Sequence, residues 1–288
     1  MDLSVIVVSF NTKQLLDDCL NSLTRGLRAS KLKAEVVVVD NDSKDGTREM
    51  LTKKYPRLVI IFNKQNVGFG KANNQGIRVA KGKYILLLNS DTVILDDAIS
   101  SLYDFSLSHQ SAFVGPKILN PDRSVQTSCG PFFTLPVVFA ALYLKGDRIG
   151  LTRWSPDETR TVDWISGACI MGERSAFLDN LLFDEEVFMY MEEVDLLMRA
   201  KQKGYHAVFY PKSRIVHVGS GSSTNKRMGP VLNIYKGLLY VYKKHYSRSA
   251  LFILRLMLKV KAAFGIIVGN SIGSVYLKQT YAEAYRLV

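Results

Sequence analysis

The fold of this chain follows from two stretches, Ser4-Val5-Ile6-Val7-Val8-Ser9-Phe10-Asn11 and Val36-Val37-Val38-Val39-Asp40-Asn41-Asp42-Ser43. Each contains a continuous run of β-branched residues, which is typical of a strand buried on both faces of a parallel sheet. Between the two runs, apolar residues from Leu15 to Leu23 recur at helical spacing. The sequence therefore predicts a β-α-β unit at the start of the chain.

The same alternation continues to about residue 90. We expect a helix over residues 47–55, a strand over 58–62, a helix over 71–80 and a strand over 84–88. This order predicts an α/β fold with a doubly wound, Rossmann-like, mostly parallel sheet flanked by helices. The alternation is lost after residue 110, where we predict a helix over about 192–203 and a strand over 206–210.

Length and composition limit the class of protein. The chain has 288 residues, of which 47% are hydrophobic and 22% are charged, and these values exclude wholesale disorder, collagen and a coiled coil. Single cores stop growing at roughly 250–300 residues, so a core with an appendage is expected. We divide the chain into residues 1–115 and 116–230, as two halves of one domain, and a helical tail over residues 231–288.

Positive charge is concentrated in the tail. The net charge is +12, and residues 226–288 hold eleven Lys or Arg residues against one acid, Glu283. This end of the chain is therefore expected to bind an anionic partner, either phospholipid or nucleic acid. Apolar residues make up much of the rest of the tail, which fits a membrane surface better than a solvated phosphate-binding arm. We predict no nucleic-acid partner.

Residues 236–268 are expected to lie on an anionic membrane surface as a basic amphipathic helix. On a continuous helix the basic residues form two adjoining strips, Lys244, Arg248, Arg255 and Lys259 on one and Lys236, Lys243 and Lys261 on the other. The segment from Leu251 to Val268 carries only three charges, which is marginal for a membrane span. The alternative is that the tail packs on the core or on a second copy of the chain in a homo-oligomer.

The cysteines and the N-terminal residues indicate the cellular compartment of the protein. The three cysteines are odd in number and far apart, which argues against a disulfide framework or a zinc site. The chain start, Met1 to Val5, lacks the basic and apolar regions of a secretory signal. We therefore expect a cytoplasmic protein.

Polar residues follow every predicted strand of the first half. They are Ser9 and Asn11 after the first strand, Asp40 after the second, Asn66 after the third, and Asn89, Ser90 and Asp91 after the fourth. Taken singly, each is as readily an ordinary loop residue or helix cap. Open parallel sheets bind ligands beyond the carboxyl ends of their strands, so four such groups on one rim favour a binding site.

Asp91 is a candidate metal ligand. It places a carboxylate at the rim, where a hard cation and a diphosphate could meet. His217, which follows the strand-like residues 214–216, could supply a second ligand. The alternatives are that Asp91 caps a helix and that His217 is structural.

Three acids near the start of the helix at residue 192 are candidate general bases. Asp195 has Arg199 four residues on, a spacing that favours an ion pair, and Glu192 lies on the same face. Glu193 has no cation at helical spacing, so it is the better base if it lies beside a cleft. The alternative is that all three merely complement the helix dipole.

Other nucleotide-binding motifs fit poorly. In Gly68-Phe69-Gly70 the third glycine of a dinucleotide-binding loop is replaced by Asn73, and the motif follows the third strand rather than the first. The sequence has no phosphate-binding loop of the GxxxxGK[ST] type. A nucleotidyltransferase would need a glycine-rich loop with basic residues after the first strand, where Ser9 to Thr12 stand instead.

Together, these residues resemble the family 2 glycosyltransferases of the GT-A fold, particularly the bacterial rhamnosyltransferase-like branch. The resemblance covers about residues 3–222. It rests on the order and spacing of residues 4–11, 36–47, 66–74, 87–91, 164–171 and 190–199, followed by His217.

The resemblance implies a role for each candidate residue. Those expected to bind the nucleotide sugar are Ser9, Asn11, Asp40, Asn66, Lys71, Asn89 and Ser90, with Asp40 accepting a hydrogen bond from a pyrimidine base. Asp91 and His217 would hold Mg²⁺ or Mn²⁺. Trp164, Gly167 and Ala168 would line the pocket for the sugar and the acceptor. Glu193 matches the family's usual Asp base, and Glu192 or Asp195 could serve instead.

The implied activity is an inverting, metal-dependent sugar transfer. Residues 1–115 would bind the nucleotide sugar and residues 116–230 the acceptor. The expected donor is dTDP-rhamnose, with a UDP-sugar as the alternative and a nucleotidyltransferase as the less favoured enzyme class. The acceptor would be a glycan on a polyprenyl diphosphate, in surface polysaccharide synthesis. The protein would then be peripheral on the inner face of the cell membrane, held there by its tail.

Overall fold

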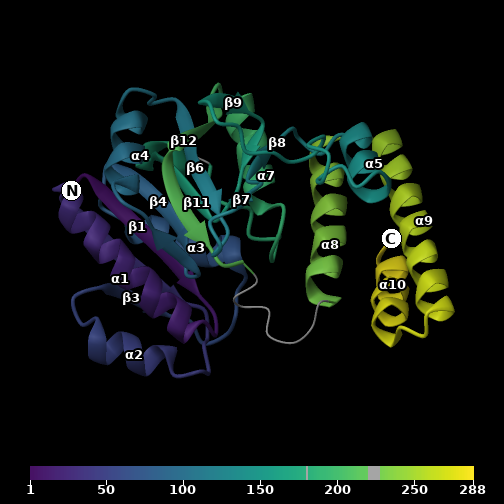
Figure 1. Cartoon of the computed structure of the whole chain (residues 1–288), viewed down its shortest axis with the longest axis horizontal. Helices are drawn as coiled ribbons and strands as arrows, with labels where there is room; N and C mark the ends of the chain where they lie inside the picture. The colour runs from purple at the N-terminus through teal and green to yellow at the C-terminus, as the bar shows by residue number, and fades with distance from the viewer. Residues whose placement is uncertain (180, 220–227) are drawn as a thin grey trace.

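A computed structural model describes residues 1–179, 181–219 and 228–288, and shows a sheet with helices on both faces beside a group of helices from the tail (Figure 1). The strands are β1 Leu3–Ser9, β2 Ala34–Asp40, β3 Val59–Phe62, β4 Tyr84–Asn89, β5 Thr92–Ile94, β6 Ala112–Leu119, β7 Val125–Gln126, β8 Cys129–Gly130, β9 Arg160–Val162, β10 Trp164–Ile165, β11 Cys169–Glu173 and β12 His206–His217. The helices are α1 Lys13–Ser30, α2 Thr47–Lys54, α3 Phe69–Val79, α4 Ala98–Leu107, α5 Leu135–Tyr143, α6 Arg174–Leu178, α7 Glu192–Gln202, α8 Met228–His245, α9 Arg248–Ser271 and α10 Val275–Leu287.

The main sheet has the strand order β3-β2-β1-β4-β11-β6-β12-β5. Strands β3, β2, β1 and β4 are parallel, and β11 runs antiparallel between β4 and β6. In the β1–β2 register Ser9 lies opposite Asp40, and in the β1–β4 register Val8 lies opposite Asn89. The polar residues that follow β1, β2 and β4 therefore meet at one rim of the sheet.

Alternate residues of the central strands enter two separate cores. Val5 and Val7 pack with α1 and α4 on one face, whereas Ile6 belongs to the cluster with α3 and α7 on the other. Successive strand side chains point to opposite faces, so a strand that is apolar at every position is buried on both. This confirms the predicted α/β fold with a mostly parallel, helix-flanked sheet.

The second half of the chain contains more regular structure than the sequence predicts. Helices α5 and α6 are not predicted, and residues 206–210 and 214–216 form parts of one strand, β12, with a register shift between Tyr210 and Arg214. That irregularity breaks the apolar pattern, which explains why the two parts look separate in sequence. Residues 220–227, within the predicted segment 116–230, lie outside the described residues.

The tail is helical, as predicted, but it is not one continuous helix. Helix α8 ends at His245, and Ser247 caps the start of α9 by accepting a hydrogen bond from the amide of Ala250. The helical phase is therefore reset between the two halves of the predicted basic strips. None of the helices in the described ranges has the length and apolar character needed to cross a membrane.

Two lysines of the predicted membrane face point into the protein instead. Lys244 forms ion pairs with Asp184 and Asp195, and Lys261 donates to the carbonyl of Leu142 at 2.8 Å. The expectation that these two residues belong to a lipid-facing strip is therefore wrong. The cause is tertiary contact, which helical spacing alone does not reveal.

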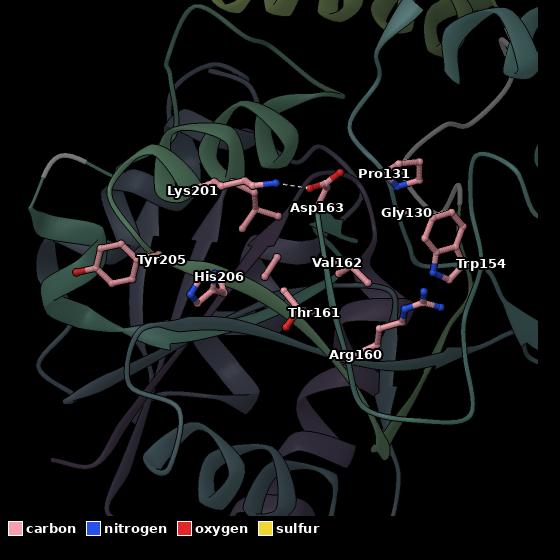
Figure 2. Close-up of a pocket in the computed structure, with 12 residues that line it drawn as sticks. Gly130, Pro131, Trp154, Arg160, Thr161, Val162, Asp163, Lys201, Tyr205 and His206 are labelled. Atoms are coloured by element: carbon pink, nitrogen blue, oxygen red, sulfur yellow. Dashed lines mark hydrogen bonds and ion pairs between the residues drawn. The ribbon is translucent and has the colours of Figure 1, made fainter. Parts of the chain in front are cut away.

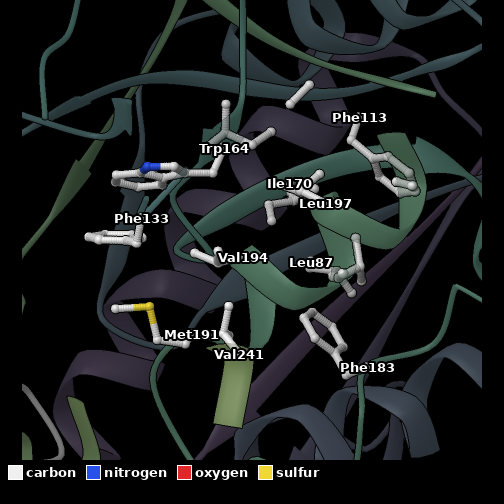
Figure 3. Packing of buried hydrophobic residues seen from close by; sticks show 14 of the residues in the cluster. Leu87, Phe113, Phe133, Trp164, Ile170, Phe183, Met191, Val194, Leu197 and Val241 are labelled. Carbon is white, nitrogen blue, oxygen red and sulfur yellow. The ribbon is translucent and has the colours of Figure 1, made fainter. Parts of the chain in front are cut away.

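The tail shares its buried core with the sheet domain. Residues of α8, α9 and α10 belong to the same cluster as Leu87 of β4 and Val194 of α7. Figure 3 shows Val241 of α8 in this cluster with Met191 and Val194. Helix α8 is thus packed directly against the start of α7, where the candidate bases lie.

Candidate active site

The loops that follow β1 and β2 interlock through Asn11. Its amide donates to the Oγ of Ser43 at 2.9 Å, and its side-chain oxygen accepts from the amide of Lys44 at 2.7 Å. Both Asn11 and Asp42 have positive φ angles, 52° and 73°. Such backbone conformations are uncommon for non-glycine residues and occur often at functional sites. The two loops therefore form one fixed wall of the rim.

A chain of hydroxyl groups connects β1 to β4. The Oγ atoms of Ser9 and Ser90 both lie within hydrogen-bond distance of Thr12 Oγ1, at 2.9 and 3.0 Å. The structure thus brings Ser9 and Ser90 together, as predicted for residues of one site. Thr12 was not predicted, although it stands one turn after Ser9 and directly before α1.

Asp40 is fully buried, and only one of its two carboxylate oxygens has hydrogen-bond partners. Its Oδ2 accepts from Arg48 Nε at 2.7 Å and from the amide of Ser43 at 3.3 Å. Its Oδ1 is buried with no hydrogen-bond partner. Arg48, which sequence reasoning missed, therefore fixes the carboxylate in one orientation and leaves one oxygen available. The sequence signal was a cation in the first turn of the helix that follows Asp40.

The Asn66 and Lys71 side chains have partners within the protein. Asn66 Oδ1 accepts from Asn41 Nδ2 at 2.8 Å and from the Gly68 amide at 3.0 Å. Lys71 Nζ lies 3.4 Å from Glu185 on the protein surface. Asn66 thus shapes the loop before α3, and Lys71 would need to exchange its surface ion pair to contact a ligand.

Asn89, Asp91 and His217 lie together at the end of β4. His217 Nε2 is 3.3 Å from both Asp91 Oδ1 and Asn89 Nδ2. Its other ring nitrogen, Nδ1, lies 2.8 Å from Gln126 Oε1. Gln126 Nε2 donates to Asn120 Oδ1, which orients the amide so that its oxygen accepts from His217. In the neutral imidazole, this arrangement places the proton on Nδ1 and leaves the lone pair on Nε2, the nitrogen nearer to Asp91 and Asn89.

These residues fit a divalent cation. A histidine that binds a metal usually donates its second ring N–H to a neighbouring acceptor, as His217 does to Gln126. Among the described residues no group of three or more His, Cys, Asp or Glu side chains is placed to hold a metal. Mg²⁺ commonly binds through one or two protein ligands together with substrate phosphates, and Mn²⁺ accepts the same oxygen ligands. Asp91 and His217 therefore suit an ion that the donor diphosphate helps to hold. Gln126 was missed, and nothing in its sequence position indicates the contact.

The acids Glu192 and Glu193 stand at the first turn of α7, close to the turn between β10 and β11. A Cβ atom added at Gly167 would lie 3.6 Å from Glu193 Cβ. The next residue, Ala168, accepts a backbone hydrogen bond from Asn89 at 3.0 Å. Gly167 and Ala168 thus connect the acid pair to the end of β4. The absence of a side chain at Gly167 leaves room beside Glu193.

Burial raises the pKa of both acids. For Glu192 the pKa rises well above its ordinary value, because the side chain is desolvated and the charge of Glu193 adds to the effect. Burial also raises the pKa of Glu193, although backbone amides and the charge of Arg153 act in the opposite direction. Glu192 is only 6% exposed, whereas Glu193 is partly exposed. Glu193 is thus the more accessible member of the pair.

Trp164 is only 3% exposed and lies in the core. Its indole Nε1 donates to the carbonyl of Pro131 at 2.9 Å, its ring stacks with Phe133, and Arg153 lies over it at 5.5 Å. In this conformation Trp164 therefore does not present its ring to a sugar. It instead packs in the core, at the start of the segment that contains Gly167.

Asp195 is fully buried, makes ion pairs with two cations and is also contacted by a histidine. Arg199, Lys244 and His245 approach its carboxylate at 2.8, 2.8 and 2.7 Å. Burial alone would raise the pKa of Asp195, but the hydrogen bonds from His245 and Lys244 and the charge of Arg199 outweigh it and lower the pKa to about 2. A carboxylate with so low a pKa, whose oxygens already have partners, is a poor general base.

Four carboxyl or amide oxygens in the described ranges are buried without a hydrogen-bond partner. They belong to Asp40, Asn89, Glu192 and Glu193, all of which were predicted as site residues. Native proteins pair nearly all buried polar atoms, so each exception calls for an explanation. A ligand that supplied the missing donors, or a cation, would satisfy all four.

Comparison with known proteins gives the family. Residues 4–127 match the family described as "Glycosyl transferase family 2". The chain is also 29% identical over 242 residues to the "N-acetylglucosaminyl-diphospho-decaprenol L-rhamnosyltransferase" of Mycobacterium tuberculosis, covering 75% of each chain. The chain is a glycosyltransferase similar to family 2.

Solved structures agree on the GT-A fold of the glycosyltransferase. It superposes on GalNAc-T7 with UDP, GalNAc and Mn²⁺ at a TM-score of 0.60, with 17% identity over 84% of this chain and 47% of that one. It superposes equally well on the mannosyltransferase PcManGT of Pyrobaculum calidifontis with GDP-Man and Mn²⁺, with 16% identity over 99% and 79% of the two chains. The glycosyltransferase thus spans about half the length of GalNAc-T7.

A cavity of about 230 Å³ lies beside the second half of α7 in the glycosyltransferase (Figure 2). Among the residues that line it are Trp154, Arg160, Lys201 and His206, and Lys201 forms an ion pair with Asp163. None of the residues predicted from the sequence lines this cavity. The predicted residues lie instead at the strand ends and at the first turn of α7.

Asp195 is expected to stabilise the glycosyltransferase. Asp195→Asn leaves buried cations without their counter-charge, so the free energy of unfolding should fall by about 3 kcal/mol or more. Because the folded-state pKa is lowered, the stabilisation is present above the unfolded pKa of about 4 and is lost as the pH falls toward 2. Urea unfolding at pH 7 measures the difference. Glu186→Gln, at an exposed acid in the segment before α7, is the control, and equal stability of the two variants would contradict the prediction.

Proposed function

We propose that this glycosyltransferase is an inverting, metal-dependent enzyme that transfers rhamnose from dTDP-rhamnose to a glycan on a polyprenyl diphosphate. The observation that carries the proposal is the set of four unpartnered buried oxygens, on Asp40, Asn89, Glu192 and Glu193. They lie along one rim of the sheet, in the order that a nucleoside, a diphosphate and an acceptor would require.

The nucleoside binds beside Asp40. Arg48 holds one carboxylate oxygen, and the second oxygen accepts the N–H of a thymine or uracil base. Asn11 and the hydroxyl groups of Ser9 and Ser90 form the adjacent wall of the rim. A buried, oriented acceptor favours a base that presents an N–H group at that position, because a base without one there leaves the carboxylate unpaired.

Asp91 and His217 hold the divalent cation, either Mg²⁺ or Mn²⁺. When bound, the cation offsets the negative charge that develops on the departing nucleotide diphosphate. Gln126 keeps His217 in the tautomer whose Nε2 lone pair faces Asp91. Asn89, between these groups, contributes its unpartnered oxygen to the same place.

Glu193 removes the proton from the attacking hydroxyl of the acceptor. The hydroxyl oxygen then forms a bond to the anomeric carbon from the face opposite the diphosphate. The bond from that carbon to the diphosphate oxygen breaks, and its electron pair leaves with the nucleotide. One displacement of this kind inverts the anomeric configuration. The raised pKa of Glu193 makes it a stronger proton acceptor than an ordinary glutamate.

The choice of donor and acceptor is supported by similarity. The mycobacterial relative is, by its name, a rhamnosyltransferase that acts on N-acetylglucosaminyl-diphospho-decaprenol. A UDP-sugar donor is the alternative, because uracil and thymine present the same N–H to Asp40. Surface polysaccharide synthesis at the inner face of the membrane is the corresponding process.

A donor-hydrolysis screen tests the proposal. Purified protein is incubated with dTDP-rhamnose, UDP-glucose, UDP-N-acetylglucosamine and GDP-mannose, each with Mg²⁺, Mn²⁺ or EDTA. We expect metal-dependent release of dTDP above that of the other nucleotides. Preferential release of UDP would select the alternative donor, and preferential release of GDP would contradict the proposed pyrimidine nucleotide donor.

The tail is proposed to hold the enzyme on an anionic membrane. Helix α9 exposes a row of apolar side chains at every fourth position, Phe252, Leu256, Val260 and Phe264, with exposed fractions of 51–70%. Arg248 and Arg255 are exposed on the same helix. Exposed apolar residues beside basic ones are typical of a helix that lies in the membrane interface.

Polar substitution of this row should weaken binding to membranes. Leu256→Ser combined with Phe264→Ser removes two large apolar groups, so partitioning onto vesicles that contain anionic lipid should fall at least tenfold. Vesicle sedimentation measures the change. Val79→Ser with Leu107→Ser, at exposed apolar positions of α3 and of the end of α4, is the matched control. Equal sedimentation of the two double variants would place the membrane contact elsewhere.

A further inference from the structure

Two consecutive residues directly before the acid pair have left-handed backbone conformations. Tyr190 and Met191 have φ angles of 67° and 73°, and Met191 is the residue that precedes the first turn of α7. Side chains with a Cβ rarely adopt this conformation, and it persists only when the surrounding structure enforces it. The direction in which Glu193 leaves this turn therefore depends on whatever holds the turn in place.

Helix α8 packs directly on this turn. A Cβ atom added at Gly237 would lie 2.7 Å from the carbonyl oxygen of Tyr190 and 2.8 Å from Met191 Cγ. Only glycine permits so close an approach of the two backbones. Val241, one turn further along α8, lies in the buried cluster with Met191 and Val194 (Figure 3).

The end of α8 contacts α7 on the C-terminal side of Glu193. Lys244 and His245 both contact Asp195, which is two residues after Glu193 on α7. Lys244 also pairs with Asp184, to which the hydroxyl of Tyr240 donates a hydrogen bond. Helix α8 thus contacts the turn that precedes Glu193 and also Asp195, two residues after it.

We propose that helix α8 is a clamp that positions Glu193 for catalysis, with Gly237 and His245 as its positioning residues. The inference rests on the proposed role of Glu193 as the base. A misplacement of about 1 Å can lower the rate of a catalysed step by roughly 10²-fold, so loss of the clamp should reduce turnover rather than donor binding.

The test compares two glycine substitutions in the same helix. Gly237→Ala forces a Cβ against the Tyr190 carbonyl, whereas Gly229→Ala adds a Cβ where no atom lies within 4 Å. Both changes replace glycine by a better helix former in the same helix, Gly229 in its first turn and Gly237 in its interior. We expect Gly237→Ala to lower kcat at least tenfold at temperatures where the variant is folded, with an unchanged KM for the donor and unchanged kinetics for Gly229→Ala. Equal kcat values for the two variants would overturn the clamp.

A double-mutant cycle separates positioning from a general structural effect. If Gly237 acts through Glu193, Gly237→Ala should cause no further loss of kcat in a Glu193→Gln background. An equal loss in both backgrounds would overturn the proposal. Wild-type activity of Glu193→Gln alone is a different result, because it would overturn the assignment of the base.

A second pair of variants serves if Gly237→Ala folds poorly. His245→Ala removes a hydrogen bond to Asp195 without adding atoms, and His245→Gln retains a donor there. We expect a lower kcat for His245→Ala and recovery for His245→Gln, measured at temperatures where both variants are folded. A wild-type kcat for His245→Ala would overturn the proposal.

Discussion

Glu193→Gln is expected to lower the rate of sugar transfer by roughly 10²–10⁴-fold, which is the usual contribution of a general base. Glutamine preserves the shape of the side chain but accepts no proton. Donor affinity should change little, because Glu193 lies beside Gly167 rather than beside Asp40. Transfer assays at saturating donor, together with a binding measurement for the donor, separate the two effects.

Three further variants control this result. Glu193→Asp restores the residue usual in the family and should retain part of the activity. Glu192→Gln and Asp195→Asn should transfer sugar faster than Glu193→Gln. If Glu193→Gln instead works at the wild-type rate while one of these neighbours is inactive, the role of the base moves to that neighbour.

The raised pKa of Glu193 adds two expectations. Its acid form persists to a higher pH than for an ordinary glutamate, so kcat/KM should decline with falling pH at a point above about 4.3. A folded-state pKa above the unfolded value also means that ionisation destabilises the fold as the pH rises through this range. Glu193→Gln should therefore unfold at a higher temperature than the wild type at pH 7, and at a similar temperature at pH 4.

Asp91→Ala has the second largest expected effect, a fall in metal-dependent transfer of roughly 10²-fold or more. Asp91 lies at the end of β4 beside His217, so its loss removes a cation ligand without opening the core. The melting temperature should stay close to that of the wild type. Kinetics at increasing Mn²⁺ concentrations measure the change, which should include a higher requirement for the metal.

Asp97→Ala is the matched control for Asp91→Ala. Asp97 is an exposed acid six residues further on, just before α4, and its side chain makes no capping hydrogen bond. It should retain wild-type kinetics. Unchanged turnover of Asp91→Ala, or full activity of the wild type in EDTA, would contradict the proposed metal site.

The sheet and its functional rim could be predicted because both depend on local sequence. Apolar runs such as Val36–Val39 identify strands buried on both faces, and the polar residues that follow parallel strands necessarily meet at one edge. Ser9, Asp40 and Asn89 therefore lie close together in the structure, as the pattern of strands and helices implies.

The parts of the candidate site that the sequence did not predict depend on contacts between residues far apart in the chain. Gln126 orients His217 across 91 residues, and His245 contacts Asp195 across 50. Neither contact produces a periodic pattern. Trp164 was expected from the family resemblance to line a sugar pocket, but its neighbours in space enclose it in this structure.

The orientation of the basic residues of the tail was predicted incorrectly for a related reason. Helical phase was extended across Tyr246 and Ser247, where the chain changes direction between α8 and α9. Lys244 then looked like a membrane-facing residue, although it is bound to the start of α7 through Asp195. Helix α8 packs on the turn before the proposed base, and the row of exposed apolar residues at every fourth position lies on α9.

The central claim is a single displacement at the anomeric carbon, with Glu193 as the base. It is tested most directly by the configuration of the new glycosidic bond, measured as the one-bond C1–H1 coupling of the transferred sugar by NMR. The account predicts the configuration opposite to that of the sugar in the donor. Retention of the donor configuration would contradict it, because retention requires two displacements or a different route to the product.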